Sequence, residues 1–352
     1  MKNKNRQIVI IVSIVLIVLL FVIPFGIAAM IYESNFGERY ETYGPMARNM
    51  EEFEGLKVKA YTFTSNQGQK LAGYKYYKEL EIIKGVVIIA HGLGGGGHNS
   101  YMDVADYMTR NGYVVFAYDA TGNDKSEGRS VRGIPQGIID LDYAIRFVKE
   151  TPDFHDLPIV LFGHSWGGYS VGSALNLHSD VKAVVMLAGF NESMDIIEEE
   201  GRRIAGSGIN VLLPYISLYE RIKLGKYASF SCIEGFEHSA AGVMMIHSED
   251  DEMISRKYAI DIFKELYENN PRFQFIQYKD RGHNYVYYSD AAREYKDSIN
   301  IEFEEYVKSL DVELSSEIKE SYLYNHLNKE LLFILDEELM NRIVNFYDNY
   351  IK

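Results

Sequence analysis

A serine flanked by closely spaced glycines is the first feature of this chain that could do chemistry. Residues 163–167, GHSWG, follow the apolar run 158–162 directly. A buried strand that leads into a Gly-x-Ser-x-Gly turn is typical of a nucleophile elbow, which exposes the serine hydroxyl above the strand end. A serine hydroxyl is a weak nucleophile until a base removes its proton. The motif therefore predicts Ser165 as a nucleophile and requires partners elsewhere in the chain.

The candidate base is a histidine that follows a later strand candidate. Residues 273–278 alternate like a strand, and His283 comes shortly after them. In open α/β sheets, functional side chains lie just past the carboxyl ends of the strands. His283 would take the proton of Ser165 and later return it to the leaving group.

The candidate acid lies in an acidic turn after the predicted strand 242–246. We predict Asp251, from its distance after the strand and from the apolar Ile254 three residues on. Its carboxylate would orient the imidazole of His283 and stabilise the charged ring. Glu249 and Asp250 remain alternatives for this role.

A glycine-rich loop is the candidate for an oxyanion hole. The predicted strand 85–90 leads into residues 91–98, HGLGGGGH. The backbone N–H groups of Leu93 and Trp166 would hold the developing oxyanion. No Gly-Lys-Ser/Thr follows the glycines, so a phosphate-binding loop is disfavoured. His91 and His98 are interpreted as loop histidines, and no metal or organic cofactor is implied.

Together these motifs resemble the α/β-hydrolase superfamily, most closely its branch of serine aminopeptidases and monoacylglycerol-lipase-like enzymes. The resemblance covers roughly residues 56–310, and the order Ser165, Asp251, His283 is that of the superfamily. One departure is visible, because the family commonly has Arg-Gly-His-Gly where residues 121–124 are TGND. This loop surrounds the site, so the departure bears on the substrate more than on the chemistry. The matching segments are residues 91–94, 118–122, 163–167, 247–254 and 282–283.

Apolar strand patterns alternate with helical patterns along the body of the chain. This alternation predicts the α/β class, with a mostly parallel sheet covered by helices on both faces. The alternation breaks over about residues 191–241, which we predict to form a small helical cap with its apolar side toward the substrate. The strand candidates are residues 56–65, 70–77, 85–90, 113–118, 158–162, 181–187, 242–246 and 273–278.

The N-terminal segment is predicted to cross a membrane. Residues 7–32 carry no charge, and such a helix is long enough to span the hydrocarbon core. Basic residues precede this segment and acidic residues follow it, which predicts a single-pass anchor with the catalytic domain outside the cytoplasm. The alternative is a cleaved signal peptide, for which Gly26-Ile27-Ala28 could be the cleavage site.

The whole chain divides into four predicted parts. Residues 1–32 form the cytoplasmic tip and anchor, 33–55 a linker, 56–310 the hydrolase domain, and 311–352 a C-terminal helical extension. The net charge of −14 disfavours a nucleic-acid partner. The single cysteine, Cys232, excludes an internal disulfide. The oligomeric state has no signal in the sequence.

These observations predict a membrane-anchored serine hydrolase that cleaves a carboxylic ester through an acyl-enzyme. The expected substrate is an amphiphilic ester such as a monoacylglycerol or a lysophospholipid. A peptidase is the alternative, in which three glutamates of the cap, residues 198–200, would anchor a substrate amine. A non-catalytic binding or scaffold protein on the same fold is the alternative of a different class.

Overall fold

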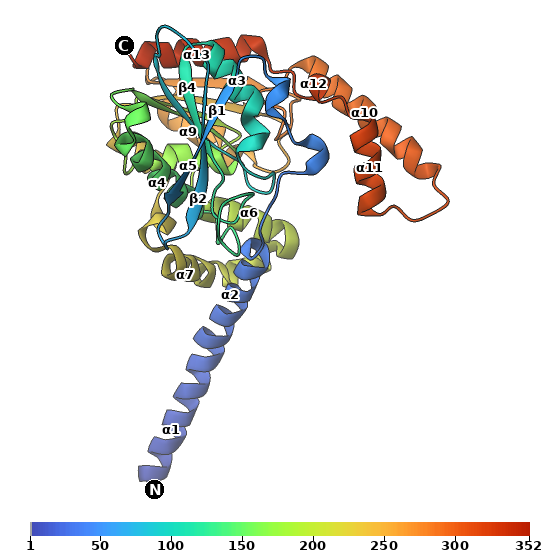
Figure 1. The fold of residues 1–352 in the computed structure, drawn as a ribbon. Coiled ribbons are helices and arrows are strands. Elements are labelled where there is room, and N and C mark those ends of the chain that lie inside the picture. Colours follow the sequence, from blue (N-terminus) through green and yellow to red (C-terminus); the bar gives the residue numbers. More distant parts are fainter. Residues whose placement is uncertain (1) are drawn as a thin grey trace.

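The computed structural model describes residues 2–352 and is built around an eight-stranded sheet (Figure 1). The strand order is β1-β2-β4-β3-β5-β6-β7-β8, in which β1 and β2 are antiparallel to their neighbours and all other pairs are parallel. The predicted α/β fold with a mostly parallel sheet is therefore confirmed. The strands are β1 (Lys57–Thr64), β2 (Lys70–Tyr77), β3 (Gly85–Ala90), β4 (Tyr113–Tyr118), β5 (Ile159–His164), β6 (Ala183–Leu187), β7 (Gly242–Ser248) and β8 (Phe273–Tyr278).

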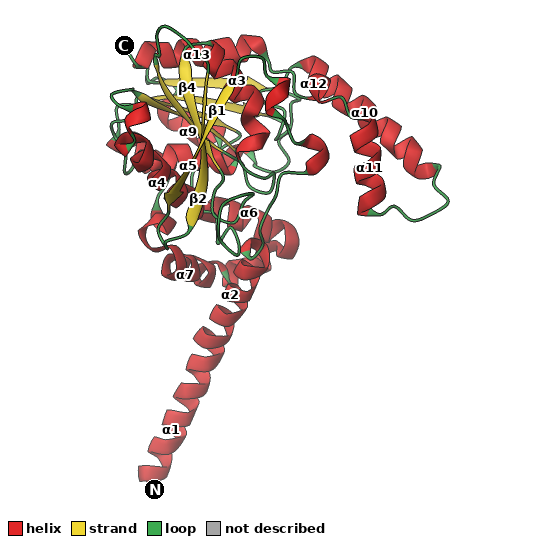
Figure 2. Cartoon of the chain, viewed as in Figure 1, coloured by secondary structure: helices red, strands yellow, loops and turns green. Residues whose placement is uncertain are grey.

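Helices cover the sheet on both faces (Figure 2). Alternate residues of β3 show the two layers, because Val86 and Ile88 join one core cluster while Val87 and Ile89 join the other. The first cluster packs against α4, α5, α8 and α9, and the second against α3 and α13. The helices of these layers are α3 (Met102–Arg110), α4 (Gln136–Glu150), α5 (Trp166–Ala174), α8 (Cys232–His238), α9 (Ile260–Tyr267) and α13 (Glu337–Tyr350).

The C-terminal region divides into a projecting part and a core helix. The helices α10 (Asp290–Lys308) and α11 (Ser316–His326) extend away from the sheet, and the short α12 (Lys329–Leu332) leads back to it (Figure 1). Helix α13 then covers the sheet, and the Tyr347 hydroxyl donates a hydrogen bond of 2.8 Å to the Leu161 carbonyl of β5. We therefore propose that the hydrolase body extends to about residue 350, rather than ending at residue 310.

The N-terminal helix is long, apolar and separate from the body for most of its length (Figure 1). It runs through α1 (Lys2–Ile17), a π-helical turn at Val18–Val22 and α2 (Ile23–Phe36). The stretch Lys4–Phe36, 33 residues, is long and apolar enough to cross a membrane, a property that signal sequences share. Its contacts with the body lie mainly at its C-terminal end, chiefly with α7 (Leu213–Leu224) of the cap.

The segment after this helix lies against the body instead of forming a free tether. Tyr40 pairs with Asn123 in a parallel bridge. The Thr42 backbone N–H and hydroxyl both donate to the Asp124 carboxylate, at 2.6 and 2.7 Å. Arg48 is 7 % exposed and forms an ion pair of 3.0 Å with Asp103 of α3. The predicted linker is thus bound to the hydrolase body along its length.

Candidate active site

The turn between β5 and α5 has the strained backbone of a nucleophile elbow. Ser165 has φ 56° and ψ −117°, a conformation that L residues rarely adopt. A side chain at Gly163 would collide with the Gly167 carbonyl, and one at Gly167 would collide with the Ala90 carbonyl of β3. Only glycine fits at either position, which explains the spacing of the motif.

The structure brings Ser165, His283 and Asp251 together in one hydrogen-bonded chain. The distance from the Ser165 Oγ to the His283 Nε2 is 2.8 Å. On the other side of the ring, His283 Nδ1 lies 2.9 Å from Asp251 Oδ2. With a proton on Nδ1 bound to the carboxylate, Nε2 is free to accept the serine proton. The three side chains come from loops after β5, β7 and β8, at the carboxyl edge of the sheet.

Asp251 is held as a carboxylate by its surroundings. Its Oδ1 accepts hydrogen bonds of 2.9 Å from the backbone N–H groups of Met253 and Ile254. Burial opposes ionisation, but the hydrogen bond and the charge of His283, together with the backbone donors, lower its pKa below the ordinary value. The side chain can therefore stabilise an imidazolium at neutral pH.

The two rival acids have other contacts. Asp250 Oδ1 accepts a hydrogen bond of 2.8 Å from the Gly282 N–H and another from the Ser248 hydroxyl, so it shapes the loop that carries His283. Glu249 faces Arg256 at 3.8 Å with a half-exposed side chain. Of the three candidates, Asp251 is the one in contact with the histidine ring.

A second histidine connects the glycine-rich loop to the loop of His283. The Tyr101 hydroxyl accepts from the Gly92 N–H at 3.0 Å and lies 3.1 Å from His164 Nδ1. His164 Nε2 lies 2.9 Å from the His283 carbonyl oxygen, to which its N–H donates. Burial, followed by the nearby charge of His283, lowers the pKa of His164 to about 3. His164 is therefore neutral, and it fixes the backbone of the candidate base.

The two predicted oxyanion donors both lie at the cavity that contains Ser165. Trp166 is the first residue of α5, so its N–H has no acceptor within the helix. Leu93 lies in the loop after β3, in which Gly94 and Gly96 adopt positive φ angles of 86° and 83°. His91 supports this loop, because its Nδ1 lies 2.7 Å from the Gly92 carbonyl and its Nε2 accepts from the Ala120 N–H at 2.9 Å.

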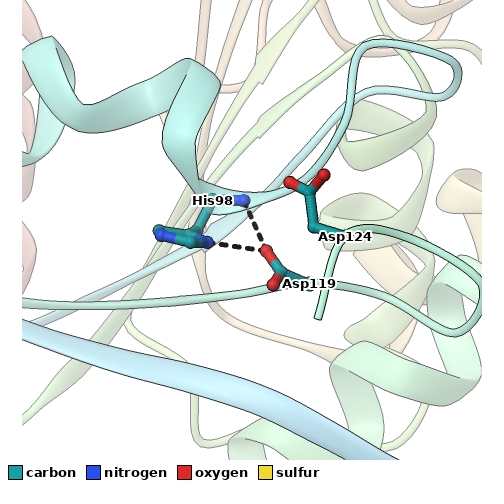
Figure 3. A group of neighbouring side chains, drawn as sticks. All are labelled: His98, Asp119 and Asp124. Carbon is teal, nitrogen blue, oxygen red and sulfur yellow. Dashed lines mark hydrogen bonds and ion pairs between the residues drawn. The ribbon is translucent and has the colours of Figure 1, made fainter. Parts of the chain in front are cut away.

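The cluster of His98, Asp119 and Asp124 has the residue types of a metal site (Figure 3). Its carboxylates, however, already accept hydrogen bonds from the protein. Asp119 Oδ1 accepts from the His98 backbone and lies 2.7 Å from its ring Nδ1. Asp124 accepts from Thr42 and, at 2.8 Å, from the Gly97 N–H. The cluster fastens the glycine-rich loop to the segment after the N-terminal helix, which is a structural role.

The candidate nucleophile and base lie in a cavity of about 770 Å³. This volume is within the range of about 300–1,000 Å³ that is typical of small-molecule sites. Cap residues from α6 (Ser193–Ala205) and the turn before α7 give it an apolar wall. Side chains of the segment 41–48 and of the loop after His283 give it a more polar region. The main apolar side chains are Phe190, Ile197, Ile204, Ile209 and Ile216.

A buried polar contact joins the cap to the N-terminal helix. Glu220 of α7 is 1 % exposed, and its Oε1 accepts hydrogen bonds from the Tyr32 hydroxyl at 2.8 Å and the Ser193 hydroxyl at 2.7 Å. Its Oε2 has no hydrogen-bond partner among the residues that the structure describes. Burial raises the pKa of Glu220 from 4.5 to about 7.

Substitution of Glu220 by glutamine should flatten the pH dependence of stability. Between pH 4.5 and about 7 the folded state binds more protons at this carboxyl than the unfolded state, so stability falls as the pH rises. At pH 8 this costs the wild type about 3 kcal/mol, which Glu220→Gln would remove. Thermal unfolding at pH 5 and pH 8 measures the difference. The exposed Glu265→Gln is the control, and equal pH slopes in all three proteins would contradict the expectation.

Comparisons with known proteins agree with this fold. Residues 81–225 match the family model described as serine aminopeptidase, S33. The monoglyceride lipase of Rattus norvegicus is 26 % identical over 148 residues, which cover 41 % of this chain and 48 % of that protein. The quorum-quenching protein AidA of Acinetobacter baumannii is 27 % identical over 138 residues, covering 38 % and 45 %. The chain thus spans about half the length of the curated relatives it matches.

Solved structures show the same fold. The esterase PF2001 of Pyrococcus furiosus superposes with a TM-score of 0.53 at 17 % identity, over 77 % of this chain and 97 % of that one. Acetyl xylan esterase 1 of Thermoanaerobacterium gives a TM-score of 0.51 at 17 % identity, over 71 % and 84 %. The chain therefore has the α/β-hydrolase fold. Over less than half of its length it is also similar to the serine aminopeptidase family and to monoglyceride lipases.

Sequence reasoning missed several residues that build this site. Tyr101 and His164 carry no motif of their own. Asp124 occupies the loop that departs from the family pattern, and this departure was the available signal. The cavity residues of the N-terminal helix had no such signal in the sequence, because their apolar pattern predicts the end of a membrane span.

Proposed function

We propose that this protein is a membrane-anchored serine hydrolase that cleaves a carboxylic ester with an apolar acyl group. The observation that carries the proposal is the chain Ser165–His283–Asp251, whose serine and histidine face a largely apolar cavity. A base hydrogen-bonded to a serine and to a buried carboxylate is the arrangement that activates a serine hydroxyl. The names of relatives such as the monoglyceride lipases are consistent with an ester substrate.

The reaction would proceed in two halves. Ser165 Oγ attacks the ester carbonyl while His283 Nε2 takes its proton, and the Leu93 and Trp166 N–H groups hold the oxyanion. The C–O bond to the alcohol then breaks, and His283 protonates the departing alcohol. Water, deprotonated by the same histidine, attacks the acyl-enzyme and releases the acid. Asp251 keeps the ring oriented and stabilises its charged form throughout.

The anchoring part of the proposal rests on the N-terminal helix and its contact with the cap. Ala28, at which a signal peptidase could cut, lies in α2 and is 0 % exposed, because it packs against the cap. On the N-terminal side of this point, Phe25 also packs against Tyr219 of the cap. These contacts favour an uncleaved anchor. The charge asymmetry around the helix favours a catalytic domain outside the cytoplasm.

The peptidase alternative depends on a free acidic group in the cap that could bind a substrate amine. Each of the three glutamates has a partner in the protein. Glu198 pairs with Arg202 at 2.7 Å, Glu200 pairs with Arg203, and Glu199 accepts from the Ser255 N–H at 3.2 Å. These contacts disfavour the amine anchor and favour the ester.

The substrate class can be tested by giving the purified full chain a monoacylglycerol series and a series of aminoacyl 4-nitroanilides. We expect kcat/KM for the preferred monoacylglycerol to exceed that for any amide by about a hundredfold or more. Faster cleavage of amides with a free amine would instead identify an aminopeptidase. A folded protein that turns over neither series and whose Ser165 resists a fluorophosphonate would leave two explanations, a closed cap or a binding protein, which removal of the cap distinguishes.

A further inference from the structure

The end of the N-terminal helix is part of the cavity wall. Ile31, Tyr32 and Phe36 of α2 line the same cavity as Ser165 and His283. They face it together with Ile209 and Ile216 of the cap. A helix that only anchored the protein would have no need to line the cavity that contains Ser165 and His283.

The position of this helix end is fixed by contacts of different kinds. Tyr32 is 2 % exposed, and its hydroxyl donates to the buried Glu220 carboxyl of α7. On the next residue, Glu33 accepts from the Tyr219 hydroxyl at 2.6 Å and forms an ion pair with Lys223. Further down the helix, the rings of Phe25 and Tyr219 pack edge to face at 5.9 Å. The helix end and α7 therefore move as one body.

Helix α7 also reaches the apolar part of the N-terminal helix. The Tyr215 hydroxyl contacts the Leu20 carbonyl, well inside the stretch that could span a membrane. The cap also carries exposed apolar side chains, and one of them, Ile204, lines the cavity as well. The cap therefore contacts both the cavity and the part of the molecule that would meet the membrane.

We propose that Ile31 to Phe36 close the acyl end of the cavity and set the length of acyl chain that the enzyme accepts. This inference rests on the proposed ester hydrolysis and adds a specificity-determining wall to it. An acyl chain that extends under the cap would contact the β-branched Ile31 side chain. Each acyl methylene that contacts this apolar wall strengthens binding of the transition state. A methylene for which the cavity has no room makes no such contribution.

The test compares the full-length wild type with Ile31→Trp, Ile31→Ala and Met30→Trp, all in phospholipid nanodiscs. Met30 is the matched control, because it is the preceding residue of the same helix and is 70 % exposed. The readout is the ratio of kcat/KM for 4-nitrophenyl dodecanoate to that for 4-nitrophenyl acetate. We expect Ile31→Trp to lower this ratio at least about tenfold, since roughly two or more methylenes lose their contacts. Ile31→Ala should raise the ratio, because it opens the wall to a longer acyl chain, and Met30→Trp should leave the ratio unchanged.

An unchanged ratio in both Ile31 variants would contradict the proposed role of Ile31. An equal loss of kcat/KM on both esters would contradict it as well. Ile31→Ala protects the test against a tryptophan variant that fails to fold. Failure of the proposed function is a separate result, namely no hydrolysis of any ester by wild type whose Ser165 reacts with a fluorophosphonate. The role of Ile31 would then be tested with the rates at which an ethyl and a dodecyl fluorophosphonate label Ser165. If the ratio of the dodecyl rate to the ethyl rate were equal in all four proteins, the proposal would be rejected.

Discussion

Replacement of Ser165 by alanine is expected to lower ester turnover by at least about 10⁴-fold and to abolish labelling by a fluorophosphonate. The Ser165 hydroxyl is the group within 2.8 Å of His283 Nε2, and no acyl-enzyme can form without it. Alanine removes a single oxygen from a turn whose backbone geometry is set by the neighbouring glycines. The variant should therefore remain folded, which circular dichroism and thermal unfolding would show.

Ser170→Ala is the matched control for this experiment. Ser170 lies on α5, the helix that follows Ser165, and its hydroxyl donates a hydrogen bond of 2.7 Å to the Trp166 carbonyl. It should keep labelling and turnover. Persistent labelling of the Ser165→Ala protein would place the reactive serine elsewhere and would refute the assignment. If folded wild type resists the probe, the same measurement after replacement of residues 193–229 by a short linker, which leaves α8 in place, distinguishes a closed cap from a binding protein.

The second large effect is expected at Asp251. Asp251→Asn should lower turnover by about 10⁴-fold while leaving the fold intact. An amide can donate to His283 Nδ1, which would place the ring proton on Nε2, where it faces the serine. The base would then be in the wrong tautomer, and the imidazolium would lose its neighbouring negative charge. Turnover at saturating substrate and the rate of fluorophosphonate labelling should fall together.

Asp250→Asn tests the assignment of the acid against its neighbour. The Asp250 side chain binds the Gly282 N–H and the Ser248 hydroxyl, and an asparagine can keep one or both bonds. We expect a much smaller loss than at Asp251. If Asp250→Asn were the more damaging change, the acid in the working enzyme would be Asp250, and the His283 loop would have to move to meet it.

The sheet and the three site residues could be predicted because their signals are local. The parallel strands β3 to β7 are buried on both faces, so each appears in the sequence as a short, mainly apolar run such as residues 85–90, whereas the edge strand β8 alternates. The functional side chains follow such runs directly, since parallel strands end at a common edge of the sheet. Ser165 also carries a backbone constraint that only glycine neighbours satisfy, which leaves a recognisable motif.

The rest depends on contacts between segments far apart in the chain. Tyr32 and Glu220 are 188 residues apart, and the local sequence around either residue does not predict their contact. Tyr347 and Leu161 are 186 residues apart, and the apolar period of α13 predicts a helix without saying that it covers the sheet. Which of the three adjacent acids contacts His283 likewise depends on the geometry of the loop, and the spacing of these residues after the strand predicts that geometry only in part.

The bound segment between the N-terminal helix and the hydrolase body has a consequence for how the enzyme would meet its substrate. The contacts of Thr42 with Asp124 and of Arg48 with Asp103 leave little slack between helix and active site. With the helix in a bilayer, the serine would be held at a constant height above that bilayer. The search for substrate would then be lateral, and its rate would follow the mole fraction of ester in the same membrane rather than its bulk concentration. Lipid in a neighbouring vesicle would remain out of reach until it transferred into the membrane of the enzyme.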